Sequence, residues 1–142
     1  MVRAVLDANV YVSAAVRPEG PPGRIIDRFL RGGVFEIVVS QAIVDEVLRA
    51  LSYPKVRKYI RRGLDPELWF EDIVVLAHFV AGEREVEGAS KDPDDDKYIA
   101  VAIEGRAGCL VAGDSDLLDL REYDGIRIVS PRAFLNLLVP RS

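Results

Sequence analysis

The sequence predicts an α/β fold, in which a central and mainly parallel sheet lies between two layers of helices. Two observations carry this prediction. Short apolar runs recur along the chain, and amphipathic stretches of helical period separate them. Near-continuous apolar strands that alternate with helices are typical of parallel sheets buried on both faces. The expected architecture is therefore a three-layer α/β/α sandwich.

Strands are expected where the apolar runs are short and rich in branched residues. They lie at residues 3–6, 35–39, 83–86, 109–112 and 126–129. Helices are expected between start and stop signals, at residues 24–31, 41–51, 55–62, 66 to about 80, 93 to about 106, and 131–138. Ser40 can cap the second of these helices, and Asp65-Pro66 and Asp92-Pro93 each join a capping residue to a proline at the first helical position. The segment 17–23, rich in Pro and Gly, is an expected loop.

Length and composition are those of one folded unit. A chain of 142 residues with 49% apolar and 30% charged residues can bury one core, so a single domain over residues 1–142 is expected. The N-terminus carries an acid inside its apolar run, unlike a secretory signal. No stretch approaches the roughly 18 consecutive apolar residues that a membrane span needs. A cytoplasmic protein without membrane contact is expected.

The scarcity of cysteine and histidine restricts the kinds of metal site that the chain can form. Cys109 is the only cysteine and His78 the only histidine, which excludes an intrachain disulfide, a cysteine-based zinc site and a His-rich metal site. Any metal ion must then be held by oxygen ligands. The net charge of −4 argues against a general nucleic-acid coat, because cationic contacts dominate affinity for phosphate backbones. A cluster of acids that awaits cations would itself lower the charge.

Two acidic residues follow buried strands. Asp7 comes directly after Val5-Leu6, and Asp114 follows the run 110–113. In open parallel sheets, ligands bind in the crevice beyond the carboxyl ends of the strands. Two carboxylates placed there repel each other unless a cation lies between them. Metal binding is therefore favoured over the alternative that each acid only caps a helix or turn.

A third candidate is Asp96, near the start of the helix expected after residue 92. It lies on the same helical face as the apolar residues at i+3, i+4 and i+7. An ionised carboxylate on such a face is costly unless it is paired or bound to a metal ion. Its neighbours Asp92, Asp94 and Asp95 have a milder explanation, since acids in the first turn complement the helix dipole. That explanation also remains open for Asp96.

The helix expected over residues 41–51 offers one more acid, and helical geometry does not select it. Asp45 and Glu46 lie about equally far from the centre of its apolar side, on opposite flanks. Either acid, or both, can belong to a plain solvated face.

Four short segments combine these acids with apolar runs. They are VLDANV at Val5–Val10, SQAIVDEV at Ser40–Val47, DKYIAVA at Asp96–Ala102 and LVAGDSDL at Leu110–Leu117. In this order and spacing they resemble the PIN-domain nucleases, especially the VapC-like toxins of bacterial and archaeal toxin–antitoxin pairs. The resemblance covers nearly the whole chain.

The resemblance implies a set of residues around a metal ion. The implied catalytic and metal-ligating quartet is Asp7, Glu46, Asp96 and Asp114, with Asp116 as a candidate fifth acid. The resemblance thus decides for Glu46 over Asp45. Small polar residues are implied near the metal at Asn9 and Ser40. The family often has Thr at the position of Ala112, and Ser115 is the candidate replacement for its hydroxyl.

An all-oxygen site suits Mg²⁺ or Mn²⁺. Such ions activate water and relieve charge on the phosphate and the leaving oxygen, as phosphodiester hydrolysis requires. The resemblance adds single-stranded RNA as the substrate, a cognate antitoxin as partner, and a homodimer. The expected activity is that of a metal-dependent endoribonuclease and toxin.

Cationic side chains that can contact the RNA backbone lie on two of the expected helices, and Tyr59 among them can stack on a base. They are Arg24, Arg28, Lys55, Arg57, Lys58, Arg61 and Arg62. The alternative for the second group is a solvated helix face.

Two other functions remain open. A phosphoaspartyl protein, either a haloacid-dehalogenase-like phosphatase or a receiver domain, also has an aspartate after its first strand. The phosphatases have a second aspartate two residues later, where this chain has Asn9, and receivers have paired acids before the strand, which residues 1–3 lack. The other alternative is a catalytically silent PIN-like domain that binds RNA or protein, and it requires a degraded quartet.

Overall fold

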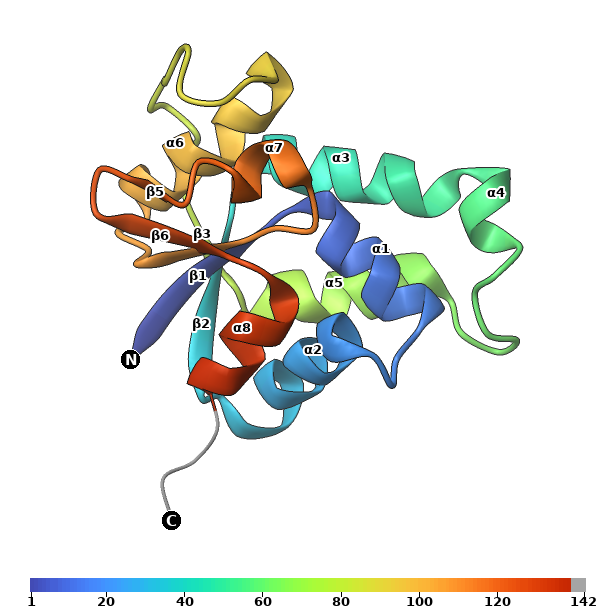
Figure 1. Cartoon of the computed structure of the whole chain (residues 1–142). Coiled ribbons are helices and arrows are strands. Elements are labelled where there is room, and N and C mark those ends of the chain that lie inside the picture. Colours follow the sequence, from blue (N-terminus) through green and yellow to red (C-terminus); the bar gives the residue numbers. More distant parts are fainter. Residues whose placement is uncertain (139–142) are drawn as a thin grey trace.

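A six-stranded sheet runs through the middle of the molecule, and helices pack around it (Figure 1). The computed structural model describes residues 1–138, so the expected domain end at residue 142 lies outside the described residues. The strands are β1 (Val2–Leu6), β2 (Phe35–Val39), β3 (His78–Phe79), β4 (Cys109–Val111), β5 (Glu122–Tyr123) and β6 (Ile126–Val129). Their order across the sheet is β3-β2-β1-β4-β6-β5, and all neighbours are parallel except β5 and β6. The predicted α/β class is confirmed.

Eight helices and one 3₁₀ turn join these strands in the described part of the chain. They are α1 (Ala8–Val16), α2 (Pro21–Gly32), α3 (Gln41–Ser52), α4 (Pro54–Arg57), α5 (Pro66–Leu76), the 3₁₀ turn η1 (Pro93–Asp95), α6 (Asp96–Glu104), α7 (Ser115–Leu118) and α8 (Pro131–Leu137). Over residues 1–138, none of the helices has the length and apolar character that a membrane crossing requires.

The alternation of side chains along β2 shows that helices cover both faces of the sheet. Phe35 packs against Phe29 of α2 and Phe134 of α8, with ring centroids 5.6 and 5.1 Å away. Val38, on the opposite face, lies against the end of α6. A Cβ added to Gly105 would come within 2.4 Å of a Val38 methyl group, so only glycine permits this approach. The three-layer sandwich follows from these two sets of contacts.

The chain order creates a crevice between β1 and β4. From β1 the chain proceeds outward through β2 to β3, and then returns to the other side of β1 to form β4. The connections therefore leave the carboxyl ends of β1 and β4 in opposite directions, which is the place where open α/β sheets bind ligands. The Asp7 N–H donates to the Val111 carbonyl (3.0 Å) and holds the two strand ends together.

Most predicted elements are present, with differences at the sheet edges. The helix predicted to continue to about residue 80 ends at Leu76, because the chain then pairs with β2 as the two-residue strand β3. The strand predicted at 83–86 is wrong: the N–H groups of Gly82 and Arg84 donate to the Glu104 carboxylate instead of to a neighbouring strand. The helix predicted over 55–62 is reduced to the four residues of α4, none of which is buried.

Three elements had no counterpart in the sequence prediction, namely α1, α7 and β5. Helix α1 follows β1 without a loop, because the Asp7 side chain accepts from the Val10 N–H and caps the helix. Strand β5 is antiparallel to β6 and has only two residues, too few for a recognisable alternation. Helix α2 also begins at Pro21, inside the expected loop, since proline suits the first helical position.

Candidate functional site

Asp7 is fixed at the carboxyl end of β1. Its Oδ1 accepts from the Val10 N–H (3.0 Å) and its Oδ2 from the Gly113 N–H (3.1 Å), so one carboxylate joins the start of α1 to the loop after β4. The side chain is only 2% exposed. Burial raises the pKa of Asp7 to about 6, the charge of Asp114 adds to the rise, and the two N–H donors oppose it.

Asp114 occupies the matching position after β4. It caps the short helix α7 by accepting from the Asp116 N–H at 3.1 Å, and it is half-buried. Because β1 and β4 are parallel neighbours, their ends bring Asp7 and Asp114 to the same side of the crevice. The predicted juxtaposition of these two acids is what the structure shows.

Asp95, rather than Asp96, faces these two acids. Asp92 caps the η1 turn, and in a 3₁₀ turn the side chains at i and i+3 lie on one side, which aligns Asp95 with Asp92. Asp95 and Asp114 line the same pocket and lie close enough for their charges to interact. Burial, the proximity of Asp114 and the charges of Asp114, Asp92 and Asp7 together raise the pKa of Asp95 from 3.8 to about 8.

Asp96 is buried, as its helical face predicts, but its carboxylate points into the loop at residues 88–90. Oδ2 accepts from the Gly88 N–H (3.0 Å), and Oδ1 accepts from the N–H and hydroxyl of Ser90 (2.8 and 3.1 Å). The cost of burying the charge is therefore met by hydrogen bonds within the protein. Asp95 lines the pocket and Asp96 lies outside it, and the metal-ligating role of Asp96 stays a prediction.

Glu46 reaches the pocket from α3, whereas Asp45 is exposed and accepts from the Gln41 side chain at 2.9 Å. Both Glu46 oxygens have partners. Oε2 lies 2.5 Å from the Lys97 ammonium, and Oε1 accepts from the Tyr98 hydroxyl. The Tyr98 oxygen in turn accepts from the Ala8 N–H (3.1 Å), beside Asp7. The choice of Glu46 over Asp45, open on helical geometry, thus agrees with the position of the pocket.

The acids line a hollow of about 350 Å³ at this end of the sheet. Its lining consists of Asp7, Ala8, Asn9, Glu46, Arg49, Ala50, Tyr53, Asp92, Asp94, Asp95, Tyr98 and Asp114. Arg49 and Tyr53 were not predicted as site residues. Arg49 lies three residues after Glu46, on the same face of α3, and Tyr53 directly follows the end of that helix. The spacing from Glu46 to Arg49 was available as a signal.

The other polar residues predicted near the metal separate into two groups. Asn9 lines the acidic pocket. Ser40 is buried as the cap of α3 and lines a different hollow with Lys97, and Asp116 lines another one next to the 88–91 loop. Ser115 is exposed at the start of α7 and does not line the acidic pocket.

The predicted RNA-binding cations also lie in two places. Lys55 and its basic neighbours are on α4 and the turn after it, which continues from the end of α3 (Figure 1). Within this segment, Arg57 is paired with Glu67 at 2.6 Å, and the Lys58 ammonium lies 5.8 Å from the Tyr59 ring centroid. Arg24 and Arg28 are on α2, and Arg28 donates to the Leu138 carbonyl at 3.1 Å, so it supports α8.

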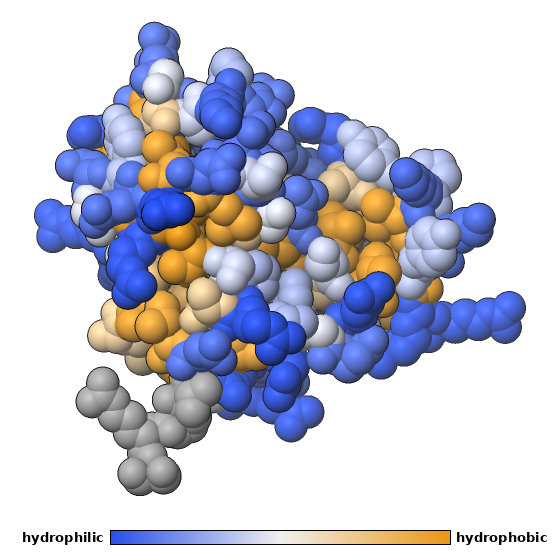
Figure 2. All heavy atoms as spheres, in the orientation of Figure 1, coloured by the Kyte–Doolittle hydropathy of each residue, from blue (hydrophilic) through white to orange (hydrophobic). Residues whose placement is uncertain are grey.

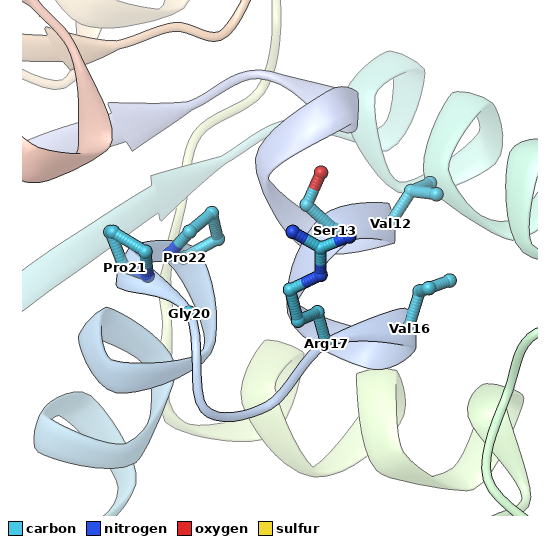
Figure 3. A pocket seen from close by; sticks show the side chains of 7 residues that line it. All are labelled: Val12, Ser13, Val16, Arg17, Gly20, Pro21 and Pro22. Atoms are coloured by element: carbon cyan, nitrogen blue, oxygen red, sulfur yellow. The ribbon is translucent and has the colours of Figure 1, made fainter.

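A larger hollow, of about 410 Å³, lies between α1 and the start of α2 (Figure 3). Val12 and Val16 project from the same side of α1, and the Arg17 side chain extends back toward Ser13. Figure 2 shows an apolar surface area in this region, bordered by charged residues. No acidic side chain lines this hollow, so its size does not make it a hydrolytic site.

The residues of the acidic pocket fit a hard divalent cation. Over residues 1–138, no three His, Cys, Asp or Glu side chains are arranged closely enough to ligate one ion directly. Mg²⁺ is usually held by one or two carboxylates and keeps several waters, so it does not need three. The buried Oδ2 of Asp95 has no hydrogen-bond partner, and Asp114 and Asp7 repel it. A cation between these carboxylates would satisfy the oxygen and remove the repulsion.

Comparison with known proteins agrees with the fold. The family model of the PIN domain matches residues 3–116. A protein of Methanocaldococcus jannaschii, named only as uncharacterized protein MJ1680, is 32% identical over 145 residues, which are 94% of this chain and 90% of the relative. A chain in the crystal structure of VapBC2 from Rickettsia felis, bound to a DNA fragment from their promoter, has a similar fold, with a TM-score of 0.56, 10% identity, and coverage of 89% of this chain and 97% of that chain. Since the family model spans most of the sequence, the chain belongs to the PIN domain family.

Proposed function

We propose that this protein is a metal-dependent endoribonuclease that hydrolyses phosphodiester bonds of single-stranded RNA. The observation that carries the proposal is the gathering of Asp7, Asp95 and Asp114 in the crevice between β1 and β4, with Glu46 on the facing helix. These acids come from four separate segments of the chain. Such a concentration of buried and half-buried negative charge destabilises the fold unless a cation relieves it.

Asp95 and Asp114 are the residues that would hold Mg²⁺ or Mn²⁺ directly, with Asp7 acting through water. Asp7 already uses one lone pair of each oxygen to accept a backbone N–H, which fixes its position at the base of the pocket. When bound, the ion supplies an activated water and neutralises the charge that develops on the phosphate.

The protein's own groups position the substrate around the acids. Arg49, on the pocket side of α3, is placed to contact a phosphate oxygen of the strand that is cut. Tyr53 is 52% exposed at the rim of the same pocket and can stack on an unpaired base. Beyond it, Lys55, Lys58 and their basic neighbours extend this path along α4.

A single strand suits this arrangement better than a duplex. Stacking requires a base that is free of its partner, and the aromatic side chains Tyr53 and Tyr59 are both exposed along the path. RNA, rather than DNA, is proposed from the resemblance to PIN-domain nucleases.

We also propose that the protein acts as the toxin of a toxin–antitoxin pair. The structural neighbour from Rickettsia felis is a VapBC2 assembly, which supports a cognate antitoxin as the partner of this chain. A homodimer is proposed on the same family grounds.

The direct test is incubation of the purified protein with labelled single-stranded RNA and DNA of the same sequence, in Mg²⁺, Mn²⁺ or EDTA. Cleavage of the RNA that needs the metal and is lost in EDTA is expected. Asp95→Asn should abolish this cleavage, and the matched variant Asp45→Asn, at an exposed acid that does not line the pocket, should retain it. Absence of metal-dependent cleavage by the wild-type protein, once bound antitoxin has been excluded, would overturn the proposal.

A further inference from the structure

Glu46 differs in its charge balance from the three acids in the crevice between β1 and β4. Asp7, Asp95 and Asp114 form no salt bridge with any cation in the described part of the chain. Glu46, across the pocket on α3, is paired with Lys97. One side of the pocket therefore carries uncompensated negative charge, and on the other side the charge of Glu46 is balanced by Lys97.

The pairing of Glu46 uses both of its oxygens. The Lys97 ammonium lies 2.5 Å from Oε2, and the Tyr98 hydroxyl donates to Oε1. The side chains of Lys97 and Glu46 are 29% and 28% exposed, so solvent screens their attraction less than that of a surface pair. Neither oxygen of Glu46 is free of a protein partner, in contrast to the unpartnered Oδ2 of Asp95.

The two residues that hold Glu46 are themselves held in place. The Tyr98 ring is only 3% exposed, and its hydroxyl oxygen accepts from the Ala8 N–H at 3.1 Å, at the start of α1. Lys97 lines the adjoining hollow with Ser40 and Ala100, so its ammonium reaches Glu46 from behind the pocket and leaves the pocket itself open. The ammonium also lies 5.4 Å from the Tyr98 ring centroid, within the range of a cation–π contact.

We infer that the ammonium of Lys97 takes the place of a second divalent cation beside Glu46, so that the pocket binds a single ion on the side of Asp95 and Asp114. This inference rests on the proposed metal dependence. A second ion at Glu46 would have to displace the ammonium and would meet its positive charge at close range. Glu46 then serves as a positioning residue: together with Lys97 and Tyr98 it forms a fixed, charge-balanced wall opposite the ion.

The test is a count of bound Mn²⁺, with the free ion measured by electron paramagnetic resonance during a titration of the whole protein. The wild-type chain should bind one Mn²⁺. Lys97→Met should gain a second one, because Glu46 then lacks its cation. Lys97→Arg keeps the positive charge and should still bind one. Lys91→Met removes an exposed lysine that pairs with Asp119 outside the pocket, and it is the matched control with a count of one.

Three results would overturn the inference: two ions or none on the wild-type protein, or a single ion on folded Lys97→Met. If Lys97→Met does not fold, as judged by circular dichroism, Glu46→Gln serves instead, and it must still bind one ion because that ion lies on the opposite side. RNA cleavage is measured on the same samples. If one ion binds and no RNA is cleaved, the proposed function is wrong and the one-ion inference still holds. If RNA is cleaved and two ions bind, only the one-ion inference is wrong.

Discussion

Asp95 and Asp96 are adjacent in the sequence, but their carboxylates lie in different regions of the molecule. One carboxylate is supplied with hydrogen-bond donors by the protein, and the other is not. The Asp96 carboxylate points toward the loop at residues 88–90, where it accepts hydrogen bonds from two backbone N–H groups and a hydroxyl. In the crevice between β1 and β4, Asp95 has a buried oxygen without a partner and faces other acids. A buried carboxylate therefore does not identify a functional site. A carboxylate oxygen that lacks protein donors and faces other acids is the stronger candidate, because a cation both completes it and relieves the repulsion.

The largest expected effect is on RNA cleavage, which should differ between variants of Asp95 and Asp96. Asp95→Asn should lower kcat/KM for RNA cleavage by at least about 100-fold, the upper range found for groups that support a bound metal. Asp96→Asn should retain most of the cleavage, because its carboxylate faces the loop and not the pocket. Both variants are assayed in saturating Mg²⁺ after their folding has been verified. Equal losses of kcat/KM in the two variants would contradict the assignment of Asp95, and not Asp96, to the active site.

The second effect concerns stability, and here Asp96→Asn, rather than Asp95→Asn, should be the damaging change. Asp96→Asn replaces a carboxylate that accepts three hydrogen bonds by an amide whose NH₂ group meets N–H donors. We expect the free energy of unfolding to fall by about 1–3 kcal/mol, the cost of leaving buried donors unsatisfied. Urea denaturation without metal measures it. Asp95→Asn, by contrast, should stabilise the metal-free protein at neutral pH, because folding raises the pKa of the Asp95 carboxyl, so that it must either take up a proton or keep a repelled charge, and an amide does neither. Destabilisation by Asp95→Asn of a similar size would contradict the comparison.

The smallest effect is the pH dependence of that stabilisation. The pKa of Asp95 is raised from 3.8 to about 8 in the folded chain, so the folded state holds this proton more tightly than the unfolded state. The contribution of the carboxyl to stability is complete below about pH 4 and is lost as the pH rises through about 8. The advantage of Asp95→Asn over wild type should therefore grow between these values, to about 1–2 kcal/mol once solvent screening is allowed for, and then level off.

Metal provides the control for this pH dependence. In EDTA the free energy of unfolding of Asp95→Asn should exceed that of the wild type by an amount that increases with pH. In excess Mg²⁺ this difference should shrink or reverse, because an ion that binds only the folded wild-type protein stabilises it. A difference that stays flat from pH 4 to pH 8 would contradict the raised pKa.

The sequence predicted the fold and most of the site because those features depend on regular periodicity. Apolar strands place Asp7 and Asp114 at parallel strand ends, and no further information is needed to bring them together. The helical face correctly predicts that Asp96 is buried, and the family resemblance, not the helical period, includes Asp96 in the quartet. The Asp92-Pro93 signal opens a 3₁₀ turn before α6, and Asp95 at the end of that turn lines the pocket.

The features that the sequence did not predict depend on contacts between distant segments. Tyr98 joins Ala8 to Glu46, and Lys97 pairs with a glutamate 51 positions away, which no local pattern can indicate. The strand β3 likewise exists because β2 offers it an edge to pair with. Such contacts are fixed by the packed fold and not by the propensity of the residues that make them.

The most direct test of the account is the position of a bound ion. A crystal grown or soaked in Mn²⁺, with data collected at a wavelength where manganese scatters anomalously, shows where the ion lies. The account predicts an anomalous peak within ligating distance of Asp95 and Asp114, with Asp7 reached directly or through water. A peak at Asp96, or no peak in the crevice between β1 and β4 at saturating Mn²⁺, would contradict it.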